Sequence, residues 1–152
     1  MRIRLGVLSL VLCVAVSSAL AQTLSPEQRQ AILDYPLTLP GAEHLIAAMQ
    51  ALTKYLISLP DYQERMRKSA TMTAAERIKQ LETDPRAAAI LKENSLTARD
   101  YLIGIPTLRM ALMAAQGAAA PNIVASPANV AFAKANLAQL KPKMDVADGI
   151  AR

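Results

Sequence analysis

TARDYLIGIPTLRMALMAAQ, residues 97–116, is the stretch of sequence that decides the fold. Residues 101–115 are apolar on nearly every side of a helix, and only Thr107 and Arg109 interrupt them. Because a helix without a polar face must be covered on all sides, this pattern is typical of a central core helix. The sequence therefore predicts such a helix over about 98–116.

Two residues inside this segment disfavour a straight helix. Pro106 removes one backbone hydrogen bond and clashes with the preceding turn, and Gly104 weakens the same region. We therefore expect a kink or a split there. Gly117 is expected to end the helix, and an alanine- and proline-containing linker over 117–127 follows it.

Helix start signals divide the rest of the chain. Hydroxyl or carboxylate side chains stand before prolines, or three residues before a glutamine or glutamate, as N-terminal caps do. Strand-like alternation of β-branched and aromatic residues is missing. The predicted fold is all-α, an irregular bundle of five to seven helices around the segment 98–116. The other expected helices cover residues 26–35, 42–57, 62–68, 74–82, 85–93 and 128–140.

The first residues have the pattern of a cleavable export signal. Two arginines precede an apolar run over 5–16, and Ala19 and Ala21 place small side chains where a signal peptidase cleaves, before Gln22. The run is shorter than the ~20 residues that span a bilayer, so no membrane span is expected after cleavage. We expect a signal peptide over 1–21, and a periplasmic or secreted protein.

Removal of the signal peptide leaves a helical domain over 22–142 and a flexible C-terminal tail over 143–152. Cys13, the single cysteine, leaves with the signal peptide, and a cysteine-free chain excludes disulfides, thiolate zinc sites and thiol nucleophiles. Without Arg2 and Arg4, fifteen basic residues stand against twelve acidic ones. They are interspersed and few aromatics accompany them, a pattern that disfavours nucleic-acid binding.

Three residues form the candidate polar site: Arg109, Asp100 and His44. Arg109 interrupts the apolar segment, so it is expected either to pair with Asp100 or Glu93 or to extend its charge to solvent. His44 is the only histidine, which excludes a multi-histidine metal site within one chain, and it is expected on the surface. An enzyme would need Asp34, His44 or Asp100 to converge in a cleft. No catalytic, cofactor-binding or metal residue is therefore assigned.

Met110 and Met113 lie one helical turn apart and allow two interpretations. Paired thioethers can hold monovalent copper in exported proteins. Methionine is also an ordinary filler of irregular helical cores, and both residues lie in the most apolar part of the chain. The sequence favours core packing.

Two resemblances follow from these residues. The runs ILKENSLTARDYL (90–102) and SPANVAF (126–132) resemble an uncharacterised family of small exported all-helical bacterial proteins, which implies a secreted helical domain and no catalytic residue. The run LSPEQ (24–28) is similar to the Leu-Thr-x-x-Gln signature of the Spy and CpxP periplasmic chaperones, with Ser25 in place of the threonine. That similarity implies a chaperone or stress sensor.

Three functional hypotheses result. The leading one is an exported, non-catalytic helical interaction or binding module of the bacterial envelope, without a cofactor. Its partner is expected to be another envelope protein or a hydrophobic ligand held between helices. The alternatives are a Spy/CpxP-like chaperone acting as a homodimer with exposed apolar surface, and a hydrolase that uses carboxylates.

Overall fold

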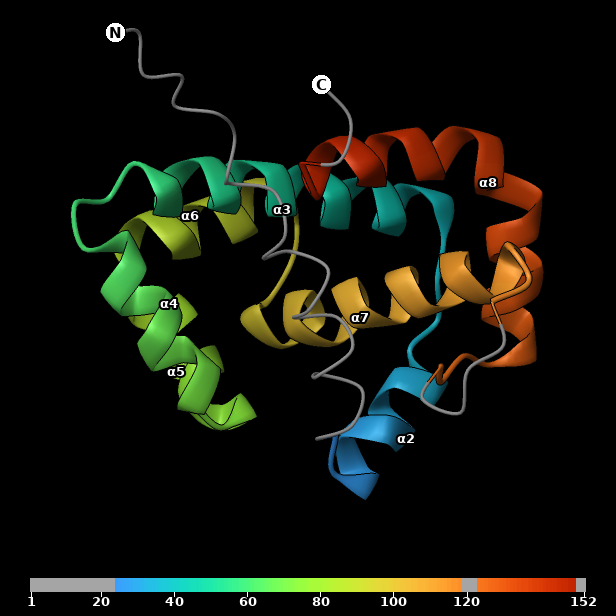
Figure 1. Ribbon diagram of the computed structural model, residues 1–152, viewed down its shortest axis with the longest axis horizontal. Coiled ribbons are helices and arrows are strands. Elements are labelled where there is room, and N and C mark those ends of the chain that lie inside the picture. Colours follow the sequence, from blue (N-terminus) through green and yellow to red (C-terminus); the bar gives the residue numbers. More distant parts are fainter. Residues whose placement is uncertain (1–23, 119–122, 150–152) are drawn as a thin grey trace, which may run out of the picture.

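The computed structural model describes residues 24–118 and 123–149, and in this part of the chain it has seven α-helices and no strand (Figure 1). The helices are α2 (Pro26–Asp34), α3 (Leu39–Ile57), α4 (Tyr62–Thr71), α5 (Ala74–Thr83), α6 (Pro85–Glu93), α7 (Ala98–Ala115) and α8 (Pro127–Ala147). The predicted all-α class is confirmed, with a helix number inside the expected range. The predicted signal peptide, with Ala19, Ala21 and Gln22, lies outside the described residues.

Capping side chains fix the starts of the helices. Three reciprocal capping boxes pair Ser25 with Gln28, Thr73 with Glu76, and Thr97 with Asp100. In each box the hydroxyl accepts from a free amide of the first turn, and the longer side chain accepts from the backbone amide of the capping residue. The predicted starts of α2, α5 and α7 are confirmed at these caps.

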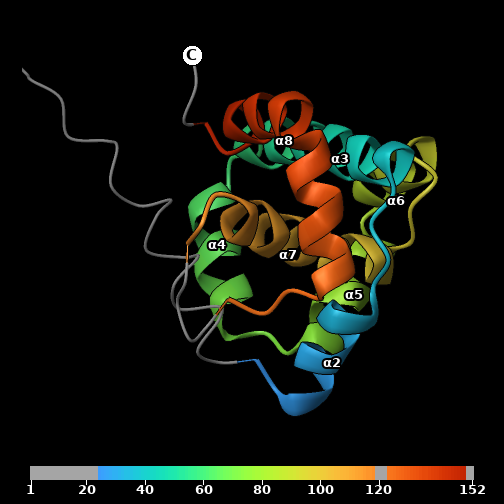
Figure 2. The same ribbon diagram turned by 90° about the vertical axis from the view of Figure 1, so that its right-hand side faces the viewer.

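α7 is the central helix, as the sequence predicts, and packs against α2, α3, α5, α6 and α8. Figure 2 shows it surrounded by these elements. It is one helix from Ala98 to Ala115, so the alternative of a split at Pro106 is wrong. The buried Thr107 is satisfied within the helix, because its hydroxyl donates to the carbonyl of Ile103 at 2.7 Å.

The main core lies between α3, α7 and α8. Leu45, Leu108 and Leu140, one from each helix, have no exposed surface. A second cluster joins α3 to α6, and a third packs Ile32 of α2 against Met110 of α7. The buried side chains therefore form three clusters rather than one layer, and this agrees with the predicted irregular packing.

Gly104 lets α7 approach α3 closely. A Cβ atom at this position would lie 2.7 Å from a methyl carbon of Leu45 and 3.1 Å from the hydroxyl of Tyr35. Atoms cannot pack at the first distance, so the close contact requires glycine. Gly104 would weaken an isolated helix, but in the folded protein its missing side chain lets α3 pack against α7.

The sequence predicts that the last helix ends near Leu140 and that a flexible tail begins at residue 143. Both predictions are wrong, because residues 141–147 are helical. α8 continues through Pro142 to Ala147, and Met144 and Ala147 are buried in the same cluster as Leu140. Burial of these two side chains outweighs the one hydrogen bond that proline removes. Residues 150–152 lie outside the described part of the chain. Over the described residues, no helix is long and apolar enough to cross a membrane.

Candidate ligand-binding cleft

Arg109 does not form either of the ion pairs expected from the sequence. Its guanidinium pairs with Asp148, which follows α8 within the segment predicted to be a flexible tail. Asp100 instead accepts from the hydroxyl and the backbone amide of Thr97, and Glu93 lies 3.8 Å from Arg86. The prediction failed because the partner is distant in sequence.

The candidate polar residues do not converge. His44 is exposed on α3, as predicted, and Asp34 is exposed at the end of α2. Among the described residues, no three histidine, cysteine, aspartate or glutamate side chains are grouped as a metal site would require. Asp34, His44 and Asp100 line neither of the two spaces described below.

The two methionines of α7 differ in environment. Met110 is 9% exposed and packs in the core, as predicted, whereas Met113 is 42% exposed, so core packing is wrong for Met113. Their one-turn spacing therefore places them in two environments rather than in one pocket.

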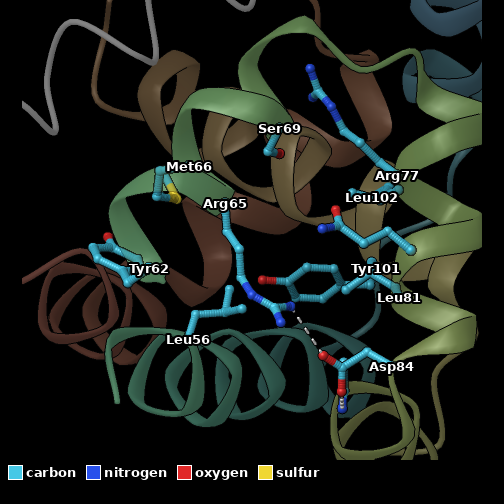
Figure 3. Close-up of a pocket in the computed structure, with 12 residues that line it drawn as sticks. Leu56, Tyr62, Arg65, Met66, Ser69, Arg77, Leu81, Asp84, Tyr101 and Leu102 are labelled. Atoms are coloured by element: carbon cyan, nitrogen blue, oxygen red, sulfur yellow. Dashed lines mark hydrogen bonds and ion pairs between the residues drawn. The ribbon is translucent and has the colours of Figure 1, made fainter. Parts of the chain in front are cut away.

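A cavity of about 130 Å³ lies beneath α4, between α3, α5 and α7 (Figure 3). α4 itself buries no residue, so it covers the cavity without entering the core. The apolar part of the wall comes from leucine, methionine, alanine and aromatic side chains on five helices. The lining residues are Leu56, Tyr62, Arg65, Met66, Ser69, Arg77, Gln80, Leu81, Asp84, Ala87, Tyr101 and Leu102.

Asp84 holds the elements around this cavity together. Its carboxylate caps α6, accepts from the Tyr55 hydroxyl at 3.0 and 3.1 Å, and lies 3.6 Å from the guanidinium of Arg65, the contact dashed in Figure 3. Burial, followed by the hydrogen bond to Asp84, raises the pKa of Tyr55. Because donors already surround Asp84, it serves as a structural acceptor rather than as a free base.

A wider groove of about 710 Å³ adjoins the cavity and runs between the start of α2, the α4–α5 turn and α7. Its apolar wall includes Leu24, Met72, Ile105 and Met110. Three residues line both spaces: Arg77, Tyr101 and Leu102. We call the cavity and the groove together the α4 cleft.

Two polar groups of the α4 cleft have unusual environments. Burial raises the pKa of Tyr101 to about 12, against a smaller opposing effect of Arg109, so its hydroxyl remains a hydrogen-bond donor at neutral pH. The Nε atom of Arg77 is buried and has no hydrogen-bond partner. A cleft with an apolar wall and unused donors can hold a ligand that is apolar over most of its length.

Of the three candidate polar residues, Arg109 lines the α4 cleft, and the sequence does not assign the other lining residues to a site. Arg65 belongs to the longest basic cluster of the chain, with Arg67 and Lys68, but a cluster on one helix does not reveal what lies across from it. Both resemblances rest on short runs of the sequence and stay predictions. Comparison with known proteins gave no matching protein-family model, curated protein or solved structure.

Proposed function

We propose that the protein is an exported binding module that holds one small molecule, apolar over most of its length, in the α4 cleft and catalyses no reaction. The observation that carries this proposal is the mainly apolar cavity under α4, which shares Arg77, Tyr101 and Leu102 with the adjoining groove. Ligand sites in helical proteins are typically such spaces between helices, with a few polar groups that fix orientation.

The chemistry of the lining favours binding over catalysis. Two carboxylates line the cleft: Asp84 in the cavity wall is occupied by a cap, a tyrosine and an arginine, and Glu27 lies exposed at the start of α2, in the wall of the groove. Tyr101 keeps its proton because its pKa is raised to about 12. Tyr101 is therefore not suited to accept a proton from a substrate at neutral pH, and the oxygens of Asp84 already have partners within the fold.

Binding is tested by titrating the purified protein with decanol and with decanoate, below their micellar concentrations, by isothermal calorimetry. We expect at least one probe to bind with one-to-one stoichiometry. Ser69→Leu fills the cavity from α4 and should weaken binding by tenfold or more, roughly the effect of displacing a few buried CH₂ groups.

Ala138→Leu adds an apolar side chain to an exposed position of α8, outside the cleft, and should leave binding unchanged. Absence of binding by both probes, or equal binding by Ser69→Leu and the original protein, would refute the proposed function. The intact mass of the purified protein tests export separately: a chain that begins at Gln22 supports it, and one that keeps residues 1–21 contradicts it.

A further inference from the structure

We infer that the ligand of the α4 cleft is an amphipathic carboxylate, and that Arg77 binds its headgroup. This inference rests on the proposed function and adds to it the chemical class of the ligand. Three arginines border the cleft, and their guanidinium groups are the only cationic groups that the described residues place in its wall.

Arg77 differs from the other two arginines of the cleft in lacking a carboxylate partner. Arg65 pairs with Asp61 at 2.8 Å and approaches Asp84, and Arg109 pairs with Asp148. Among the described residues, no carboxylate lies within ion-pair distance of Arg77. Its charge is therefore available to a ligand.

The position of Arg77 suits a headgroup site at the junction of the two spaces. Arg77 lines both the cavity and the groove, and Figure 3 shows its guanidinium extending from α5 away from Asp84. Its Nε is buried without a hydrogen-bond partner, as is the Nε of Arg109, which also lines the groove. A headgroup in the cleft therefore binds Arg77 through the terminal nitrogens of the guanidinium, which are not among the buried unpaired atoms.

Carboxylate fits these donors better than a neutral or cationic headgroup. The planar fork of a guanidinium matches the two oxygens of a carboxylate, and charge-assisted hydrogen bonds are stronger than neutral ones. The remaining wall of the groove, formed by Leu102, Ile105, Met110 and similar side chains, fits an apolar chain. Together these features select a molecule with a carboxylate at one end and an apolar body.

The experiment compares decanoate, decanol and decyltrimethylammonium, which share one chain and differ in headgroup charge. We expect decanoate to bind roughly tenfold or more tightly than decanol, the change expected for one charge-assisted contact, and the cation to bind most weakly. Arg77→Gln should remove the preference for decanoate while leaving decanol binding unchanged. Arg77→Lys keeps the charge without the fork and should retain part of the preference.

Arg99→Gln is the matched control, because it removes an exposed arginine of α7 that lines neither space. It should leave all three affinities unchanged. If decanoate and decanol bind equally well, or if the Arg77→Gln variant keeps the preference, the inference is wrong and the proposed function stands. If none of the probes binds, the proposed function fails first.

Discussion

Ser95 has a left-handed backbone conformation, with φ of 57°, at the end of α6. Its amide donates to the carbonyl of Lys92 at 3.0 Å, and the amide of Leu96 donates to Leu91 at 2.9 Å, the two hydrogen bonds of a Schellman motif. Gly117 occupies the same position after α7, with φ of 82°. The two helix ends share one backbone geometry, but only the end of α7 has glycine, the residue that adopts a positive φ without strain.

Ser95→Gly should therefore raise the free energy of unfolding by about 0.5 to 1 kcal/mol, because glycine removes the strain of a Cβ atom in this conformation. Gly117→Ala should lower it by about 1 kcal/mol for the opposite reason. Urea unfolding followed by circular dichroism measures both changes. Shifts of the same sign would contradict this account of the helix ends.

Asn129 is 3% exposed and joins the start of α8 to the connection between α2 and α3. Its side chain accepts from the amide of Leu37 at 3.1 Å and donates to the carbonyl of Tyr35 at 2.8 Å. Asn129→Ala should lower the free energy of unfolding by about 2 to 4 kcal/mol, because two backbone groups lose their partner. Asn136→Ala removes only a bond to a carbonyl within α8 and should cost less than about 1 kcal/mol in the same urea titration.

At the scale of the element, Gly104 determines how closely α7 packs on α3. Gly104→Ala should lower the free energy of unfolding by about 1 to 3 kcal/mol, because the added methyl group overlaps the fully buried Leu45. This result would oppose the helix propensity of alanine, which is more favourable by about 1 kcal/mol. In a double-mutant cycle, Gly104→Ala should be much less damaging when Leu45→Ala is already present. If the two substitutions have additive effects on the free energy of unfolding, the loss of stability does not come from the contact between residue 104 and Leu45.

The last turn of α8 belongs to the core, which gives truncation a clear expectation. A chain that ends at Pro142 loses the buried Met144 and Ala147 and the Asp148 partner of Arg109, and should be less stable by about 3 to 5 kcal/mol. A chain that ends at Gly149 keeps all three residues and should melt like the full chain. Thermal unfolding followed by circular dichroism compares them. Equal melting temperatures would show that the end of α8 does not stabilise the fold.

The elements that the sequence predicts well are those fixed by local signals. Capping boxes, prolines at first helical positions and the apolar run of α7 act within a few residues, so six of the seven helix starts follow from the sequence to within a residue. The start of α3 is wrong, because the sequence predicts it after Gly41 and the helix begins at Leu39. The end of α8 could not be predicted in this way, because Met144 stabilises this helix only when it is buried against residues of α3 and α7. The same reason explains Arg109, whose partner lies 39 residues away.

At the scale of the whole molecule, the core is concentrated in α3, α7 and α8, whereas α4 and α5 bury no residue, and of these two only α5 packs closely against other helices, α6 and α7. Local stability should follow this distribution, since amide exchange through local opening depends on the apolar contacts that are lost. Hydrogen exchange should therefore be fastest in α4 among the helices of the bundle and slowest in the middle of α3 and α7. Protection of α4 equal to that of α7 would contradict its assignment as a cover that opens locally.

The α4 cleft is also the feature that sequence reasoning could not provide. Its wall takes residues from Leu24 to Met110 that come together only when α2, α4, α5 and α7 are placed. The hypothesis of a ligand between helices could be made from composition and elimination. The position of the cleft could not be predicted, because it depends on how the helices pack against one another.

The distribution of aromatic residues gives this cleft a built-in spectroscopic signal. The chain has four tyrosines and no tryptophan. Tyr62 and Tyr101 line the cavity, and Tyr55 donates to Asp84 in its wall, so only Tyr35 lies outside this region. The ultraviolet emission of the protein therefore comes mostly from the surroundings of one site, and occupancy of that site can be followed without any label.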